Sequence, residues 1–399
     1  MTGDSGAMPR VFLRPGNDQR ISRGHPWAYS NEIRLDPATK ELAPGALVRL
    51  HRADGKPLGV GSFNPHALIA FRLFDPDPDA VVDADFFAAR LHRALASRQR
   101  LFAVPYYRLL HAEADGFPGL IADRFGDTMV LQVNTAAMEG LAPAWSAALE
   151  AVVAPAVIVL RNDTAMRLSE RLTQEVSVEK GEVTGPVKVC EGAAVYLADV
   201  VAGQKTGWFY DQRDNRAAVA AVSAGARVLD VFCHSGGFAI AAALQGARTC
   251  VGVDSSELAL GLAQQAAAAN AVSERCSFRR GDAFDALTEY VSSGERFDVV
   301  ICDPPAFVKS RKDLATGLRG YRKLARLAAT VVAPGGMLFV ASCSHNVEAA
   351  PFAIEVARGI DAAGRSGRIL REGGAAADHP RHLHLPESTY LKSLLIQID

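Results

Sequence analysis

The chain has 399 residues, of which 49% are hydrophobic and 22% charged, with 34 glycines and 20 prolines. This composition is ordinary for a folded globular protein, and it excludes a disordered chain, a collagen and a small disulfide-stapled protein. The 43 Lys and Arg residues nearly balance the 44 Asp and Glu residues, so any nucleic-acid-binding surface must be a local patch. At roughly 150 residues per domain, the length favours two or three domains.

Cysteine usage and hydropathy indicate the cellular compartment. No two of the six cysteines form a CxxC pair, which predicts reduced thiols in a cytoplasmic protein with neither a zinc site nor a disulfide framework. The first ten residues, MTGDSGAMPR, contain no apolar signal-peptide region. The apolar stretch 141–160 is interrupted by Pro143, Glu150 and Pro155. We therefore expect no signal peptide and no membrane span.

The N-terminal part of the chain predicts two small domains. Residues 1–78 contain short apolar runs separated by turn signals, with Asp54-Gly55 between LVRLH and PLGVG, as in a β-hairpin. FDPDPDA then marks a boundary, because its prolines lack backbone donors. Residues 79–188 begin with a predicted helix over 83–103. They continue with apparent strands TMVLQVN and AVIVLRN around a helix near 137–153, as in a small α/β domain.

From about residue 189 to 399, short apolar strands alternate with Ala-rich helices. The predicted strands are ARVLDVF, TCVGVD, FDVVICD and GMLFVAS, and predicted helices cover 237–245 and 256–270. This alternation predicts a Rossmann-like fold, a doubly wound parallel sheet with helices on both faces.

Acidic residues follow the strands of this predicted sheet. Asp230 ends the first strand before Gly236 and Gly237 open a helix, and Asp254 ends the second, where it can accept hydrogen bonds from ribose hydroxyls. These features alone fit NAD or S-adenosylmethionine. They also fit a structural reading, with glycines for tight packing and an aspartate as a helix cap.

Further residues favour S-adenosylmethionine over NAD. DVFCHSGG lacks the GxGxxG pattern of dinucleotide sites. Asp282 follows a third short strand, where it can meet an adenine amino group, and Asp303 follows a fourth strand in DPPAF. Acids at successive strand ends on one edge are the layout expected of an S-adenosylmethionine pocket. The Pro-Pro pair stiffens its loop and suits a surface that holds a planar base, although a structural turn is the alternative.

One cysteine differs in position from the others. Cys343 emerges past the strand GMLFVAS, between two serines, at the same predicted edge as the acids, which suits a thiol that reaches a ligand. Most cysteines in apolar strands are inert core residues, and we expect that of Cys302 and Cys250.

A basic run lies between the last two of these loops and is either a solvated helix face or a phosphate-binding surface. His379, His382 and His384 do not form a complete ligand set, so we expect no metal site. The six cations of the basic run are Lys309, Arg311, Lys312, Arg319, Arg322 and Lys323.

Taken together, these strings resemble the PUA-domain-containing, S-adenosylmethionine-dependent methyltransferases that modify carbon 5 of a cytosine in bacterial large-subunit ribosomal RNA. RGHPWAYSNEI and PGALVRLHRADGKPLGVGSFNP resemble the family's RNA-binding PUA domain, and YRLLHAEADGFPGLIADRFGD its linking domain. QKTGWFYDQRDNR, DVFCHSGGF, DPPAFVKSRKDL, RGYRKL, SCSH and PESTYLK follow its catalytic domain in order and spacing.

The resemblance implies roles for several residues. Cys343 would be the nucleophile that adds to carbon 6 of the cytosine, with its thiol pKa lowered or its proton lost on substrate binding. Asp303 would lie between cofactor and base. The resemblance does not identify the group that removes the carbon 5 proton, and Asp303 is our candidate for it. The cofactor would be bound by Asp230, Gly236, Gly237, Asp254, Asp282 and Asp303, with Phe209, Gln212 and Arg213 closing over it.

Three alternatives remain at this point. Ala306 stands where many RNA cytosine methyltransferases carry a second cysteine, and the resembled family likewise lacks that cysteine. The first alternative is a methyltransferase acting on a guanine ring nitrogen of rRNA, which shares the DPP motif and needs no nucleophilic cysteine. A non-catalytic RNA-binding assembly factor and an NAD oxidoreductase are the others. The sequence leaves open whether the chain forms a homodimer.

Overall fold

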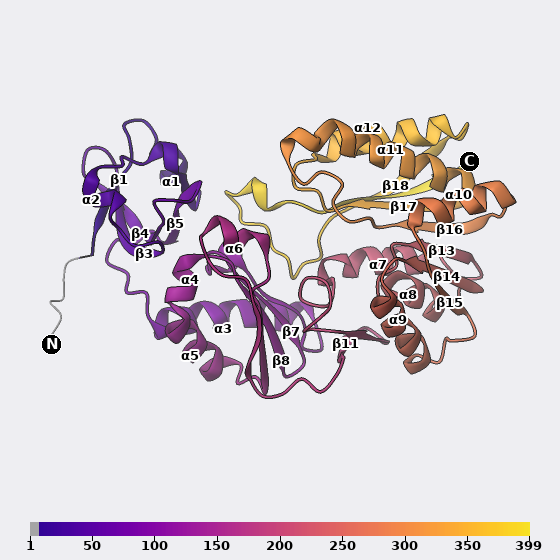
Figure 1. Cartoon of the computed structure of the whole chain (residues 1–399), viewed down its shortest axis with the longest axis horizontal. Helices are drawn as coiled ribbons and strands as arrows, with labels where there is room; N and C mark the ends of the chain where they lie inside the picture. The colour runs from indigo at the N-terminus through magenta and orange to yellow at the C-terminus, as the bar shows by residue number, and fades with distance from the viewer. Residues whose placement is uncertain (1–7) are drawn as a thin grey trace. The chain divides into compact units, whose positions relative to one another are not determined.

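The computed structural model describes residues 8–399 and divides them into two compact units (Figure 1). The first extends to Thr184 and includes Pro380–Ser388, and the second comprises Gly185–His379 and Thr389–Asp399. Residues 1–7, to which part of the signal-peptide prediction refers, lie outside the described residues.

The first unit begins with a small five-stranded sheet in the order β1-β3-β4-β5-β2. β1 runs parallel to β3, and the other neighbours are antiparallel. The hairpin predicted at Asp54-Gly55 is confirmed as the β3–β4 turn, where Gly55 has a positive φ of 89°. The elements are β1 (Arg10–Phe12), α1 (Gln19–Ser22), β2 (Trp27–Tyr29), η1 (Ser30–Glu32), α2 (Pro37–Lys40), β3 (Ala46–His51), β4 (Pro57–Phe63) and β5 (Ile69–Asp75).

The remainder of the first unit packs helices on a second five-stranded sheet, in the order β10-β9-β8-β7-β6. Helix α3 (Ala84–Leu101) begins where the Asp83 carboxylate accepts a hydrogen bond from Phe86 N, and it packs against α5. The other elements are β6 (Tyr106–His111), η2 (Ala112–Asp115), β7 (Leu120–Phe125), β8 (Thr128–Val133), α4 (Ala136–Gly140), α5 (Ala142–Val152), β9 (Val157–Arg161), α6 (Ala165–Ser169), β10 (Val176–Lys180) and η5 (Pro386–Ser388).

The second unit contains a seven-stranded sheet in the order β15-β14-β13-β16-β17-β19-β18. The five strands from β15 to β17 are parallel, as predicted, with the Rossmann-like arrangement. The purely parallel sheet that we expected is extended by β19, which runs antiparallel to both β17 and β18. The strands are β13 (Arg227–Val231), β14 (Thr249–Asp254), β15 (Cys276–Arg280), β16 (Phe297–Cys302), β17 (Val332–Ser342), β18 (Gly367–Gly373) and β19 (Lys392–Ile398).

Helices cover both faces of this sheet, α7 to α9 on one and α10 to α12 on the other (Figure 1). A separate hairpin of β11 (Val187–Glu191) and β12 (Ala194–Ala198) precedes them. The helices are η3 (Tyr210–Gln212), α7 (Arg213–Ala221), α8 (Gly237–Leu244), α9 (Glu257–Ala269), α10 (Ala283–Ser293), η4 (Arg311–Asp313), α11 (Leu314–Val331) and α12 (Ala349–Ala362).

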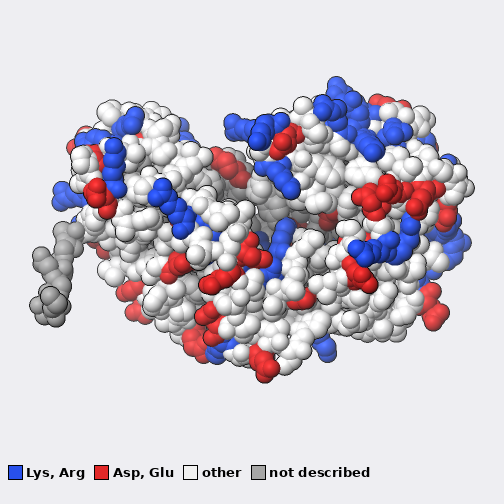
Figure 2. Space-filling model, viewed as in Figure 1, with Lys and Arg blue, Asp and Glu red and all other residues white. Residues whose placement is uncertain are grey.

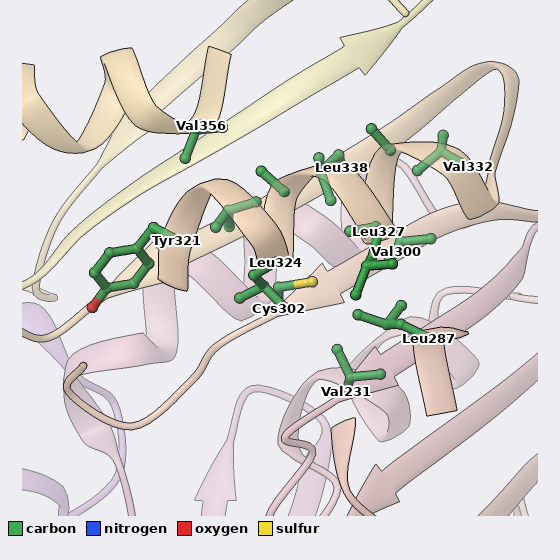
Figure 3. Close-up of a cluster of buried hydrophobic side chains, with 14 of the residues drawn as sticks. Val231, Leu287, Val300, Cys302, Tyr321, Leu324, Leu327, Val332, Leu338 and Val356 are labelled. Atoms are coloured by element: carbon green, nitrogen blue, oxygen red, sulfur yellow. The ribbon is translucent and has the colours of Figure 1, made fainter. Parts of the chain in front are cut away.

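A cluster of buried hydrophobic side chains fills the space between β16, β17 and α11 (Figure 3). Leu324 and Leu327 lie one helical turn apart and bury their side chains among Val300 and Leu338. The prediction that Cys302 and Cys250 are core residues is confirmed, because both are at most 1% exposed.

Candidate active site

The carboxyl edge of the parallel strands gathers acidic residues and a thiol. Asp230 comes at the end of β13, Asp254 ends β14, and Asp303 follows β16 directly. Cys343 follows β17 at the same edge, and Asp282 caps the helix that follows β15. This placement agrees with the sequence prediction, since parallel strands in a doubly wound sheet present their ligand-binding loops on one side.

The loop between β13 and α8 is strained. Phe232 and His234 have positive φ angles of 67° and 48°, which side chains rarely adopt, and Gly236 has a φ of 77°. Each such non-glycine residue costs of order 1–3 kcal/mol, and such strain concentrates at functional sites. Asp230 is fully buried beneath this loop.

The Asp230 carboxylate has one satisfied and one unsatisfied oxygen. Oδ2 accepts a hydrogen bond of 3.1 Å from Ala239 N, whereas no donor among the described residues reaches Oδ1. Burial, with smaller contributions from the charges of Asp303 and Asp254, raises the pKa of Asp230 well above its ordinary value. A buried polar atom without a partner is costly, so this oxygen is suited to a polar or cationic ligand.

The other cofactor-site candidates also have local structural roles. Asp254 accepts hydrogen bonds from His234 N at 2.8 Å and Ser256 N at 2.9 Å, and its two oxygens retain lone pairs for ribose hydroxyls. Asp282 is exposed and caps α10 through the backbone N–H groups of residues 284 and 285.

The two glycines are explained by packing. A Cβ on Gly236 would lie 3.1 Å from the Phe278 ring, and one on Gly237 would lie 3.2 Å from Trp208. These contacts support the packing interpretation of the glycines at this loop.

The segment QKTGWFYDQR supplies side chains to the same edge. The Phe209 ring meets the His234 ring edge-on, with centroids 5.1 Å apart, and the Gln212 side chain hydrogen-bonds Asp303. The Arg213 guanidinium lies 3.9 Å from Glu191 and 3.8 Å from Asp378, so its charge belongs to a buried ionic network. Of the three residues that we expected to close over the cofactor, Phe209 and Gln212 contact other site residues directly.

Glu191 was not found in the sequence analysis. It ends strand β11, and its carboxylate makes hydrogen bonds of 2.6–2.9 Å with Arg216 and 2.9 Å with Trp208 Nε1. Trp208 precedes Phe209 in the chain, and Arg216 donates a hydrogen bond of 3.0 Å to Phe209 O, so Glu191 anchors the segment from which Phe209 and Gln212 project. Nothing in the local sequence distinguished this glutamate, because its partners lie 17 and 25 positions away.

Asp303 has the acid–base properties of a proton acceptor near neutral pH. Burial and the neighbouring charge of Asp211 raise its pKa to about 7, while Lys205, the Gln212 hydrogen bond and Arg216 oppose the shift. The usual value for an aspartate is about 3.9. A carboxyl group that titrates near 7 is suited to general acid–base chemistry at physiological pH.

Cys343 is half-buried, and its Sγ donates a weak hydrogen bond to Pro304 O at 3.9 Å. Burial raises the pKa of its thiol, as do the charges of Asp303 and Asp211, whereas the Lys205 ammonium lowers it. The free site therefore does not lower the thiol pKa below its ordinary value. Of the two routes that we expected, deprotonation on substrate binding is the one that agrees with this environment.

Lys392 is a second residue that the sequence analysis missed. From β19, its ammonium donates hydrogen bonds to the carbonyl oxygens of Ser344, Val347 and Tyr390 at 2.5–3.0 Å. Desolvation lowers its pKa to about 8. Lys392 thus holds the backbone that follows Cys343, and it does so from the antiparallel strand that the sequence did not predict.

The basic run is mostly solvent-exposed, and Lys and Arg side chains cover the surface of the second unit over α11 and α12 (Figure 2). Arg322 differs, because its guanidinium lies 2.6 Å from the buried carboxylate of Glu355. Because Arg322 is paired with Glu355, the other five cations of the basic run are more available to bind phosphate groups. The exposed members are Lys309, Arg311, Lys312, Arg319 and Lys323.

Residues 8–399 contain no group of three or more His, Cys, Asp or Glu side chains arranged to hold a metal ion. No helix in that range has the length and apolar character needed to cross a membrane.

Comparisons with known proteins define the family. Residues 11–76 match a PUA-like domain, and residues 126–364 match the S-adenosylmethionine-dependent methyltransferase family. The chain is 38% identical over 393 residues to "Ribosomal RNA large subunit methyltransferase I" of Aeromonas hydrophila, with 97% of this chain and 98% of that protein covered. It is 35% identical to the protein of the same name from Shewanella denitrificans, covering 98% and 99%.

A solved structure shares the fold. The methyltransferase SMU.776, crystallised as a complex with SAH, superposes with a TM-score of 0.84 at 20% sequence identity, covering 98% of this chain and 100% of that one.

S-adenosylmethionine is the cofactor, and the residues at the carboxyl edge fit it. The unpartnered Asp230 Oδ1 can face a cationic group, and Asp254 retains acceptor capacity for ribose hydroxyls. When bound, this cofactor supplies a methyl group on a positively charged sulfur. The chain therefore belongs to the S-adenosylmethionine-dependent methyltransferases that carry a PUA-like domain, a family that includes the ribosomal RNA large subunit methyltransferases I.

Proposed function

We propose that this protein methylates carbon 5 of a cytosine in large-subunit ribosomal RNA through a covalent adduct between Cys343 and carbon 6. The names of its relatives support the RNA substrate. The observation that carries the chemistry is the position of the Cys343 thiol, half-exposed at the edge that also holds Asp303, with its sulfur 3.9 Å from Pro304 O. A methyltransferase that acts on a guanine ring nitrogen needs no thiol at this place.

Methylation at carbon 5 requires a nucleophile such as the Cys343 thiolate. Carbon 5 of cytosine is too weak a nucleophile to accept a methyl group unaided. Addition of the Cys343 thiolate at carbon 6 makes carbon 5 enamine-like, so that carbon 5 can take the methyl group. Removal of the carbon 5 proton then expels the thiolate and restores the aromatic ring. The target base must leave its stack to reach the thiol, as in other base-modifying enzymes.

Lys205 and Asp303 act on different protons of the reaction. The half-buried thiol is protonated in the free protein at neutral pH because its pKa is raised. The Lys205 ammonium, whose Nζ lies 4.5 Å from the centre of the Phe209 ring, favours the thiolate. We infer that Lys205 stabilises the thiolate when the base binds and that Asp303, with a pKa of about 7, accepts the proton from carbon 5.

The RNA-binding surface is also a proposal. We assign residues 1–78 to an RNA-binding domain, 79–188 to a linking domain and 189–399 to the catalytic domain. The five exposed cations of the basic run would contact the phosphates, each contact weakening as salt rises. Arg322 would contribute less, since Glu355 already neutralises it.

Methyl transfer from tritiated S-adenosylmethionine to unmodified rRNA tests this function, with the product base identified by mass spectrometry. We expect methylcytosine from the wild type, none from Cys343→Ala, and normal activity from the control Cys276→Ala on β15. Cofactor binding by calorimetry must remain intact in Cys343→Ala. A Cys343→Ala protein that still methylates, or a product on guanine, would refute the proposal.

A further inference from the structure

A buried tyrosine hydroxyl joins the two loops that hold Cys343 and Asp303. Tyr321 lies on α11, and its Oη accepts a hydrogen bond of 2.8 Å from Ser342 Oγ and lies 2.9 Å from Ser344 Oγ. These serines flank Cys343, and both are fully buried. Ser344 Oγ also accepts a hydrogen bond of 3.2 Å from the backbone N–H of Val308. The Tyr321 hydroxyl also has a hydrogen bond with the backbone of Phe307. Through this bond and the one from Val308 N to Ser344, the Cys343 loop is connected with the loop that begins at Asp303.

The packing of α11 places this hydroxyl. A Cβ on Gly317 would lie 2.2 Å from a methyl carbon of Val308, so only glycine allows the first turn of α11 to approach the loop. Tyr321 is one helical turn further on, and its ring packs on Phe307 with centroids 4.7 Å apart. The ring of Phe352 meets it edge-on from the other side at 5.2 Å. Packing thus fixes the ring, and the ring fixes the hydroxyl.

The Tyr321 hydroxyl is buried away from solvent, so its removal would leave its hydrogen-bond partners unsatisfied. Tyr321 has no exposed surface, and burial raises its pKa, so it remains a neutral donor and acceptor. Without the hydroxyl, the two buried serine hydroxyls would each lose a partner, and they would rotate to find others. Both serines adjoin Cys343 in the chain, so their hydrogen bonds to Tyr321 restrain the segments on either side of the thiol.

We propose that Tyr321 is a positioning residue that fixes the Cys343 thiol against the loop Asp303–Val308 through Ser342 and Ser344. The inference rests on the proposed function, because it assigns the thiol as the group that must be held. Misplacing a reacting atom by about 1 Å costs on the order of 100-fold in rate. A residue that served only to fill the core would affect stability and leave the reaction unchanged.

Tyr321→Phe tests the proposal, because it keeps the packed ring and removes only the hydroxyl. The RNA is a large-subunit rRNA transcript containing 5-fluorocytidine, whose carbon 5 has no proton to lose, so the methylated adduct with Cys343 persists. We expect the rate of adduct formation to fall on the order of 10- to 100-fold. The dissociation constant for S-adenosylmethionine should stay within about twofold of the wild type. Tyr290→Phe is the matched control, since that ring packs on Phe297 in the same unit, and it should leave both values unchanged.

A second variant separates positioning from general destabilisation. If Tyr321 acts through Ser344, the effects of Tyr321→Phe and Ser344→Ala on adduct formation are not additive, because either change breaks the same chain of hydrogen bonds. Fully additive effects, or a Tyr321→Phe protein that forms the adduct at the wild-type rate, would overturn the proposal.

Alkylation of Cys343 by iodoacetamide needs neither RNA nor cofactor. It therefore tests the positioning role of Tyr321 separately from the proposed function. Absence of an adduct in the wild type would refute the proposed function alone. The position of the thiol would then be judged by its alkylation rate as a function of pH. A profile in Tyr321→Phe that matches the wild type, with that of Tyr290→Phe also unchanged, would refute the positioning role.

Discussion

The pKa of Asp303 leads to a specific pH profile. An acid that titrates at about 7 must be ionised to accept a proton, so the activity that depends on it rises as the pH rises through 7. At pH 5.5 only about 3% of a group with a pKa of 7 is ionised, and at pH 8 about 90% is. The Asp303 contribution alone therefore raises the rate about 30-fold over this range.

The thiol adds a second ionisation to the profile. Because the pKa of Cys343 is raised above its ordinary value, the fraction of thiolate keeps increasing with pH throughout the neutral range, and the reaction rate increases with it. Because methyl transfer precedes removal of the carbon 5 proton, kcat/KM for the cofactor reports the thiol, and its logarithm should rise with a slope of about one. The Asp303 ionisation enters the rate at which methylated RNA is released from the adduct. The logarithm of that rate should rise with a slope of about one below pH 7 and level off above it, and in Asp303→Asn this break should vanish.

The assay follows release of methylated rRNA from the Cys343 adduct between pH 5.5 and 8, with tritiated cofactor and unmodified rRNA. Loss of a general base typically costs about 10²- to 10⁴-fold, so Asp303→Asn needs single-turnover conditions. Asp285→Asn, on the exposed face of α10, is the control and should retain the wild-type profile. A break near pH 7 that survives in Asp303→Asn would refute the assignment of Asp303 as the base.

Three other predictions concern residues around the same site. Lys205→Met removes the cation that lowers the thiol pKa, so alkylation of Cys343 by iodoacetamide should shift to higher pH, and an unchanged profile would contradict the role of Lys205. Glu191→Ala leaves the Arg216 charge buried without its partner, which should lower the free energy of unfolding by about 3–5 kcal/mol in urea denaturation, and a loss below 1 kcal/mol would contradict this. Gly236→Ala places a side chain at a φ of 77° and against packed neighbours, so we expect a lower melting temperature and weaker cofactor binding in calorimetry, and unchanged values of both would show that the loop tolerates a side chain.

The sequence by itself predicted the elements whose signals are local. Short, mostly apolar runs with an acid at or directly after their end indicated the positions of β13, β14 and β16, because a buried parallel strand reads as a nearly continuous hydrophobic segment. The rule that parallel strands share a carboxyl edge then placed Asp230, Asp254 and Asp303 together, with Cys343 beside them. The same reasoning placed Cys302 and Cys250 in the core, since they lie inside strands and not after them.

Only the tertiary structure determined what surrounds these residues. The Asp303 pKa of about 7 arises from burial and from Asp211, which is 92 positions earlier in the chain, and no local pattern encodes such an environment. Lys392 reaches the Cys343 loop from β19, an antiparallel strand whose pairing with β17 depends on contacts between segments about 50 residues apart. Tyr321 reads in the sequence as one more residue of a basic helix. Its hydroxyl joins two catalytic loops because the α11 backbone packs closely on Val308, and that approach is a property of the folded core.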